Sequence, residues 1–210
     1  MPAMPAPAPR RSPALIPARR ADLCLEFANT RFWRGAATPT ETLRELGDVL
    51  DWCARQGALD PPAARALKRG WPDGGRGAAF AGALALREAI YRVFAAIARG
   101  KAPGDADLDV LARALDQAPR RAKLKRTEAG FVWRVERLDF TVADTLAAVL
   151  WSAGDLLAGP KLGRVRLCAN PQCRWLFLDE SKSGTRRWCS MSACGNRAKA
   201  HRHYVKSRKR

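Results

Sequence analysis

Four of the six cysteines stand in two pairs of equal spacing near the C-terminal end of the chain. The pattern is C-x4-C-x15-C-x4-C, formed by Cys168, Cys173, Cys189 and Cys194. Zinc prefers four thiolates arranged as a tetrahedron, and two short pairs separated by a hairpin-sized segment supply them readily. Two disulfide bonds would satisfy the same count, as would four free thiols placed by chance. The spacing predicts a Zn²⁺ site.

The sequence around these cysteines predicts a small, treble-clef-like zinc finger. Between the pairs, "CRWLFLDESKSGTRRWC" is typical of a strand, a polar turn at Gly184 and a second strand. A helix is expected to begin near Ser192. A module of about 45 residues has too little core to fold alone, so the metal would supply the missing stability. His201 and His203 could also be ligands, but they would face different ways on a helix, and we assign them to its surface or to supporting roles.

Positive charge is concentrated in the same part of the chain. Of the net charge of +18, residues 161–210 contribute +12, from 14 Lys and Arg against two acidic residues. This asymmetry predicts a polyanionic partner, with nucleic acid first and double-stranded DNA favoured. Two alternatives stay open. In one, the source of the chain simply favours alanine and arginine. In the other, arginines such as Arg174, Arg186 and Arg187 only offset the negative charge of a zinc–thiolate centre.

The expected C-terminal helix carries a basic stripe. Lys199, Arg202 and Lys206 fall at i, i+3 and i+7 and would share one face, which suits contacts to successive phosphates. Asn196 and Arg197 lie in the first turn and are candidates for base contacts, although Asn196 could instead bond the backbone of the cysteine turn. The candidate nucleic-acid-binding residues are Arg186, Arg187, Asn196, Arg197, Lys199, Arg202 and Lys206.

The part of the chain before the cysteines is predicted to be a mostly helical α+β domain. Cap and periodicity signals predict helices over 38–57, 61–69, 78–100, 108–115 and 141–159. Alternation on both sides of residues 128–130 predicts a β-hairpin, whereas 21–32 fits a strand and a helix equally well. The glycine-rich run "GWPDGGRG" at 70–77 predicts a loop, and the glycines and proline of 159–163 separate the domain from the finger.

Residues 1–20 are predicted to be a disordered leader. Prolines at positions 2, 5, 7, 9, 13 and 17 prevent the helical apolar segment that a secretory signal needs. We therefore expect a cytoplasmic location, where thiols stay reduced and metal ligands are favoured over disulfides. No run of about 18 apolar residues is present, so no membrane span is expected.

The helical domain offers no recognisable catalytic arrangement. Both histidines lie beyond residue 200, so a Ser-His or Cys-His pair cannot form within the domain. The run "DGGRG" lacks the lysine and serine of a phosphate-binding loop. Cys53 falls on the apolar face of a predicted helix and is expected to be a small core residue. We expect no enzyme activity and no catalytic residue.

Two motifs resemble known families. The run "CGNR" at 194–197, inside "RRWCSMSACGNRAKAHRHY", resembles the CGNR zinc finger, and "DLCLEFANTR" at 22–31 resembles the start of the ABATE domain that precedes that finger. The predicted organisation is a leader at 1–20, an ABATE-like domain at 21–160 and a CGNR-type finger at 164–207. The resemblance implies a bacterial, stress-induced transcription regulator whose finger binds nucleic acid and whose N-terminal domain is a sensor.

Three classes of function remain open at this point. In the first, the chain is a zinc-dependent DNA-binding regulator whose helical domain forms a homodimer or binds a small-molecule effector. In the second, the same finger serves an RNA- or ribosome-associated factor, since charge does not distinguish the two nucleic acids. In the third, the finger is a protein-interaction module or a structural cap on an enzyme.

Overall fold

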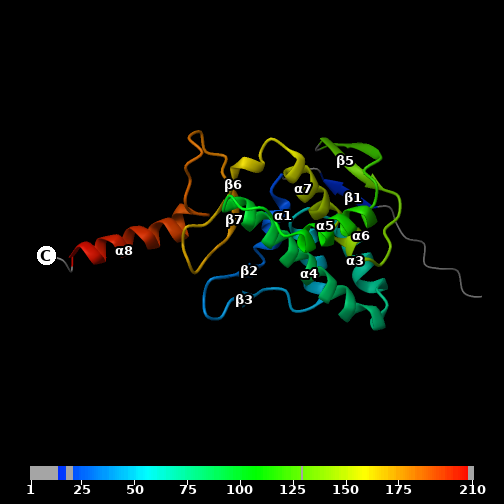
Figure 1. The fold of residues 1–210 in the computed structure, drawn as a ribbon. Helices are drawn as coiled ribbons and strands as arrows, with labels where there is room; N and C mark the ends of the chain where they lie inside the picture. The colour runs from blue at the N-terminus through cyan, green and yellow to red at the C-terminus, as the bar shows by residue number, and fades with distance from the viewer. Residues whose placement is uncertain (1–13, 18–20, 129, 208–210) are drawn as a thin grey trace, which may run out of the picture.

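A computed structural model describes residues 14–17, 21–128 and 130–207 (Figure 1). Its helices are α1 (Leu23–Ala28), α2 (Leu46–Arg55), α3 (Pro61–Gly70), α4 (Asp73–Ala98), α5 (Asp105–Gln117), α6 (Val142–Thr145), α7 (Ala147–Ala158) and α8 (Asn196–Ser207). Its strands are β1 (Ala14–Pro17), β2 (Arg31–Phe32), β3 (Thr40–Glu41), β4 (Lys123–Thr127), β5 (Gly130–Val135), β6 (Val165–Leu167) and β7 (Leu176–Leu178). Two short helical turns are η1 (Leu162–Arg164) and η2 (Met191–Gly195). A mostly helical domain with small sheets precedes the cysteine module, which confirms the predicted α+β class.

Helix α1 lies at the centre of the core, where it packs against α4 and α7. Every residue of the helix except Glu26 is buried, so apolar side chains surround it on nearly all sides. A helix that is buried all round shows no amphipathic period, which explains why the sequence of this segment fits a strand equally well. The backbone N–H of Cys24 donates to the Ser152 hydroxyl of α7 at 3.1 Å and fixes the start of α1.

The predicted hairpin is confirmed as β4 and β5, with Gly130 at a φ of +117°. Strand β1 pairs antiparallel with β5, so the sheet has the order β1-β5-β4, with Ile16 opposite Trp133. Residues 14–17 of the predicted disordered leader are therefore a strand, because Ala14 and Ile16 enter the core. Proline is tolerated at such a sheet edge. The rest of the leader lies outside the described residues.

The helix predicted over 38–57 is wrong in its first half. Helix α2 begins at Leu46, and Thr40 and Glu41 instead form β3, which pairs with β2. The Glu41 carboxylate accepts two hydrogen bonds from the buried Arg87 guanidinium, at 2.7 and 2.6 Å. This long-range ion pair holds the segment extended and outweighs the local cap signal.

The other helices follow their predicted positions with one extension. Asp60 caps α3 and Thr141 caps α6 through their side chains, and α6 and α7 divide the helix predicted over 141–159 at Leu146. Helix α4 starts at Asp73, inside the segment predicted as a loop, and includes three of its glycines. Within the described residues, no helix is long and apolar enough to cross a membrane.

Strands β6 and β7 join the cysteine module to the helical domain. They pair antiparallel and pack against α1 and α4, so that Val165, Leu176 and Leu178 belong to the main core. The prediction of a hairpin between the two cysteine pairs is wrong. Strand β7 pairs with β6, which lies before Cys168, and not with a strand after Gly184. Helix α8 extends away from the body on the side opposite the β1-β5-β4 sheet (Figure 1).

Candidate metal centre

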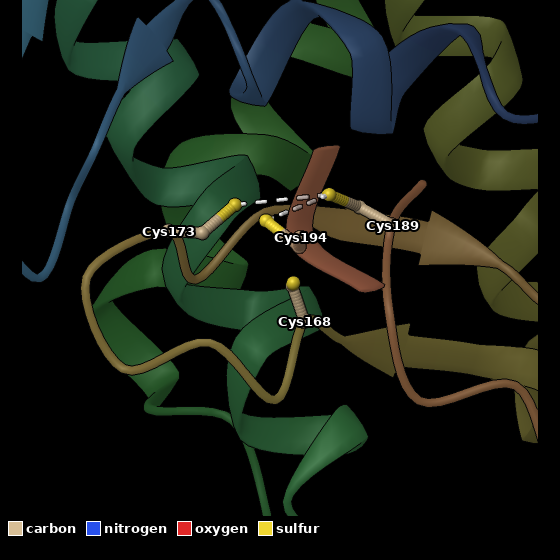
Figure 2. A group of neighbouring side chains, drawn as sticks. All are labelled: Cys168, Cys173, Cys189 and Cys194. Atoms are coloured by element: carbon tan, nitrogen blue, oxygen red, sulfur yellow. Dashed lines mark hydrogen bonds between the residues drawn. The ribbon is translucent and has the colours of Figure 1, made fainter. Parts of the chain in front are cut away.

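The four cysteines of the two pairs come together as one cluster. Their Sγ atoms point toward one another and all lie within 4.8 Å (Figure 2). Two of the separations are 3.7 Å, between Cys173 and Cys189, and 3.8 Å, between Cys189 and Cys194. A tetrahedron of sulfurs at the usual Zn–S distance has an edge of about 3.8 Å, whereas a disulfide would hold its sulfurs at about 2.05 Å. The cluster therefore has the dimensions of a four-thiolate zinc site.

A tight turn presents the first cysteine pair. Cys168 follows β6, and its N–H donates to the Trp175 carbonyl at 2.8 Å. The Asn170 carbonyl accepts from the N–H of Cys173 at 3.0 Å, and the Asn170 side-chain oxygen accepts from the N–H of Gln172. These bonds close the turn, so that both sulfurs face the same point.

The second pair lies at the entry to α8. Cys189 stands in the loop before η2, and Cys194 lies within η2. The Ser190 hydroxyl caps η2 by accepting from the N–H of Ala193. The second pair lies at the entry to a helix, as predicted for a treble-clef-like finger. The first pair lies on a turn between paired strands rather than before the predicted hairpin.

Side chains around the sulfurs screen and support them. The Asn170 amide donates to the Cys194 sulfur at 3.5 Å, a bond that strengthens when the sulfur is a thiolate. Trp33, Trp175 and Trp188 pack against the cluster, of which only Cys189 is more than slightly exposed. A metal bound here would be largely shielded from solvent.

The sulfurs are too close together to ionise independently. Hydrogen bonds from the Cys173 and Cys189 thiols lower the pKa of Cys168 to about 2. The bond to Cys168 is the main cause that raises the pKa of Cys173 to about 12, and burial adds to it. Protons thus remain in a cluster without a cation, because neighbouring thiolates repel one another. A divalent cation at the centre would favour the thiolate at every sulfur.

The two remaining cysteines take no part in the centre. Cys24 and Cys53 are fully buried in the helical domain, where loss of hydration raises the pKa of each to about 12. The Cys53 thiol donates to the Thr145 carbonyl at 3.6 Å. Cys53 is therefore a core residue, as predicted. The side chains of His201 and His203 lie outside the described part of the chain.

Arg186, one of the predicted nucleic-acid contacts, is bonded within the finger. Its Nε donates to the Trp188 carbonyl at 2.9 Å, its Nη2 contacts the Cys189 carbonyl, and its guanidinium lies over the Phe177 ring at 4.7 Å. Arg186 braces the loop that carries Cys189. This role is structural, but it differs from the charge compensation that the sequence left open for Arg186.

The remaining predicted contacts lie on α8, except Arg187, which lies in the loop before Cys189. Asn196 donates to the Ser192 carbonyl at 3.3 Å and so supports the cysteine turn, while Lys199 is exposed. Arg202 and Lys206 lie on α8, but their side chains are outside the described residues. Arg187 and Arg197 are exposed, and their guanidinium carbons lie over Trp188 at 5.6 Å and over Trp33 at 4.6 Å.

Residues of the helical domain hold the finger in place, and sequence reasoning missed them. The Asn29 side chain donates to the Leu176 carbonyl at 2.8 Å and accepts from the Leu176 N–H at 3.0 Å. The N–H of Gly35 donates to the Gln172 carbonyl at 3.0 Å, and the Tyr91 hydroxyl donates to the Arg174 carbonyl at 3.0 Å. The only signal for Asn29 is its place in "DLCLEFANTR", a motif quoted above only for its resemblance.

Comparison with known proteins agrees with this architecture. A family model described as "Putative stress-induced transcription regulator", ABATE, matches residues 21–160, and the CGNR zinc finger matches residues 164–207. A search of the curated proteins finds no match. The four-cysteine cluster lies wholly within the second match, and zinc is the metal that both the geometry and the finger family indicate. The chain therefore belongs to the ABATE family, with a CGNR zinc finger as its C-terminal part.

Proposed function

We propose that the chain is a zinc-dependent DNA-binding regulator of transcription, in which the finger contacts double-stranded DNA. The observation that carries this proposal is the four-sulfur centre at the base of α8, within a segment of net charge +12. The centre fixes one end of a basic helix that projects from the body (Figure 1). A helix of 12 residues is about 18 Å long, which suits contacts to several phosphates along a major groove.

The helical domain would have a regulatory rather than a catalytic role. Within the described residues, the four cysteines form the only cluster of potential metal ligands, and no histidine stands among the domain's buried polar groups. The β4–β5 hairpin exposes Leu124 and Phe131, which suits a surface covered by a second copy of the chain. Dimerisation or a small-molecule effector would link this domain to DNA binding in the cytoplasm.

Metal content and DNA binding of the full chain test this proposal together. We expect one zinc per chain and binding to duplex DNA that is lost on chelation and restored by zinc. Cys173→Ser should lower zinc content and DNA binding together, whereas Cys53→Ser, the matched control, should keep both. Zinc present without any duplex binding at low salt would contradict the assignment.

The salt dependence of binding tests the phosphate contacts. Each neutralised phosphate contributes about −0.9 to the slope of log K against log salt, so a basic helix that meets three or more phosphates predicts a slope of about −3 or steeper. Titrations of one duplex between about 50 and 200 mM salt measure it. A nearly flat slope would show that binding does not depend on phosphates.

RNA is the second candidate partner. Trp188 and Trp33 lie beside exposed arginines at the finger, and such aromatic groups can stack on unpaired bases. Competition between a duplex and a single-stranded RNA of the same sequence separates the two partners. Preferential displacement by RNA would favour this alternative.

A further inference from the structure

A groove of about 630 Å³ lies between the first cysteine turn and the start of α8. Residues 170–172 of the turn form one side, and Arg187 and Trp188 contribute from the loop before Cys189. Arg197 lines the groove from the first turn of α8. The groove thus joins both halves of the metal centre, and zinc would fix its shape.

Two arginines face this groove without internal partners. Arg187 and Arg197 are exposed, and among the described residues neither guanidinium forms a hydrogen bond or an ion pair. Each guanidinium lies instead near an indole, at 5.6 Å for Trp188 and 4.6 Å for Trp33. Stacking orients a guanidinium while leaving its N–H donors free. The pair is therefore oriented for a ligand that accepts hydrogen bonds and carries negative charge.

Trp33 reaches the finger from the helical domain. It has a φ of +53°, a left-handed conformation that is rare for a residue other than glycine. The loop that holds it is fixed by the N–H of Ala36, which donates to the Trp33 carbonyl at 2.9 Å, and by the bond from Gly35 to Gln172. Backbone strain of this kind persists only where surrounding contacts impose it, and it concentrates at ligand clamps.

We propose that this groove holds a phosphodiester of the bound nucleic acid between Arg187 and Arg197, and that Trp33 is a positioning residue for Arg197. This inference rests on the proposed nucleic-acid binding and locates one phosphate contact of that binding in the groove. The planar fork of arginine matches phosphate oxygens, and the +12 of residues 161–210 favours a phosphate polymer over an isolated carboxylate. The helical domain then contributes directly to the geometry of the reading surface.

Binding titrations of the full-length, zinc-loaded protein with one labelled duplex test the groove. Arg187→Ala and Arg197→Ala should each weaken binding by about 5- to 30-fold at low salt and make the salt slope shallower by about one. Arg65→Ala, which removes an exposed arginine of α3, is the matched control and should change neither quantity. Zinc content of each variant verifies that the finger is intact.

The role of Trp33 has a distinct signature. Trp33→Ala and Trp33→Phe should weaken binding without changing the salt slope, because neither removes a charge. Arg197→Lys should keep the slope and still lose affinity, since a lysine cannot present the same fork. When Trp33→Ala is already present, adding Arg197→Lys should reduce the affinity for DNA only slightly further, because the two residues act together.

Each other outcome identifies the part that fails. If Arg187→Ala and Arg197→Ala bind DNA as tightly as the wild type, the groove is not the phosphate site, and the proposed function stands. Absence of any nucleic-acid binding by the wild type would overturn both. Displacement of DNA by poly-glutamate as readily as by unlabelled DNA would assign the groove to acidic peptides. Unchanged binding by Trp33→Ala would overturn the positioning role alone.

Discussion

Asn29 joins the two halves of the chain through one side chain. Its amide bonds both the N–H and the carbonyl of Leu176, and so imitates a neighbouring strand beside β7. Asn29 is only 2% exposed, and Leu176 is equally buried. Buried backbone groups need partners, so this side chain replaces the strand that β7 lacks on that side.

Asn29→Ala should lower the free energy of unfolding by about 2–4 kcal/mol, because it leaves two buried backbone groups without partners. Chemical denaturation with saturating zinc measures the change. Gln117→Ala, which removes an exposed amide at the end of α5, should change the stability by less than about 0.5 kcal/mol. Equal stability of wild type and Asn29→Ala would show that water replaces the amide.

The pair formed by Glu41 and Arg87 makes stability depend on pH. Burial is the largest single effect on Glu41 and would raise its pKa. The hydrogen bonds and positive charge of Arg87, together with the N–H groups of Leu43 and Thr42, outweigh burial and leave this pKa below its ordinary value of 4.5. A carboxyl whose pKa is lowered on folding stabilises the protein above its unfolded pKa. That contribution is lost as the pH falls through the folded value.

Glu41→Gln should therefore cost roughly 1–2 kcal/mol at pH 7, and the difference from wild type should shrink below about pH 4.5. Denaturation of both proteins at a series of pH values gives this difference, in which the shared effect of acid on the metal site cancels. Glu180→Gln, at an exposed pair with Lys161, is the control. A difference that grew in acid would contradict the ion-pair account.

At the scale of elements, α4 begins with glycines that its surroundings do not require. A Cβ at Gly74 or Gly77 would meet no atom within 4 Å. At Gly35 a Cβ would lie 1.8 Å from the Pro171 carbonyl oxygen, where the loop approaches the first cysteine turn. Glycine is therefore required by a close contact at Gly35, whereas no neighbouring atom requires it at Gly74 or Gly77.

Gly77→Ala should raise the free energy of unfolding by about 0.5–1 kcal/mol, because alanine restricts the unfolded chain and favours the helix. Thermal denaturation measures the shift. Gly35→Ala should have the opposite effect, through its clash. A destabilised Gly77→Ala would mean that the first turns of α4 are not helical in solution.

Local signals predicted those elements whose cause is local. The caps at Asp60 and Thr141 and the turn at Gly130 each depend on neighbours within a few residues, and all were found in place. The segment at 38–45 was predicted wrongly, because its conformation depends on Arg87, 46 residues from Glu41. Likewise, no local pattern places β6 beside β7.

In the candidate site, too, the sequence predicted the residues that have a local signal and missed those that depend on long-range contacts. Cysteine spacing predicted a zinc site, and the cluster geometry agrees with it. Asn170, whose amide bonds Cys194, and Trp33, which stacks on Arg197, carry no spacing signal, because their roles depend on contacts across the fold. Charge counting, for its part, could not separate Arg186, which braces a loop, from Arg187, which faces the groove.

At the scale of the whole molecule, the metal supports only part of the finger. Strands β6 and β7 share the main core, whereas η2 and α8 have the four-sulfur cluster as their principal anchor. An isolated helix of 12 residues is marginal in water. Loss of zinc is thus expected to release the end of the chain and to leave the body folded.

Chelation should therefore remove amide protection from residues 182–207 and leave that of α1, α4 and α7 unchanged. Hydrogen exchange of the full chain with and without zinc measures this. Addition of zinc to the chelated protein serves as the control and should restore protection. Loss of protection throughout the helical domain would show that zinc supports the whole fold.

The bond between Asn29 and Leu176 also limits how early the helical domain can finish folding during synthesis. The two residues are 147 positions apart, so at about 5–20 residues per second the interval between their synthesis is about 7 to 30 s. During that interval α1 and α4 have no β7 to cover them, and contacts of such high sequence separation form slowly afterwards. Among the described elements, the first helix is therefore covered only after the last strand, β7, has been synthesised, and the nascent chain keeps an uncovered apolar surface until then.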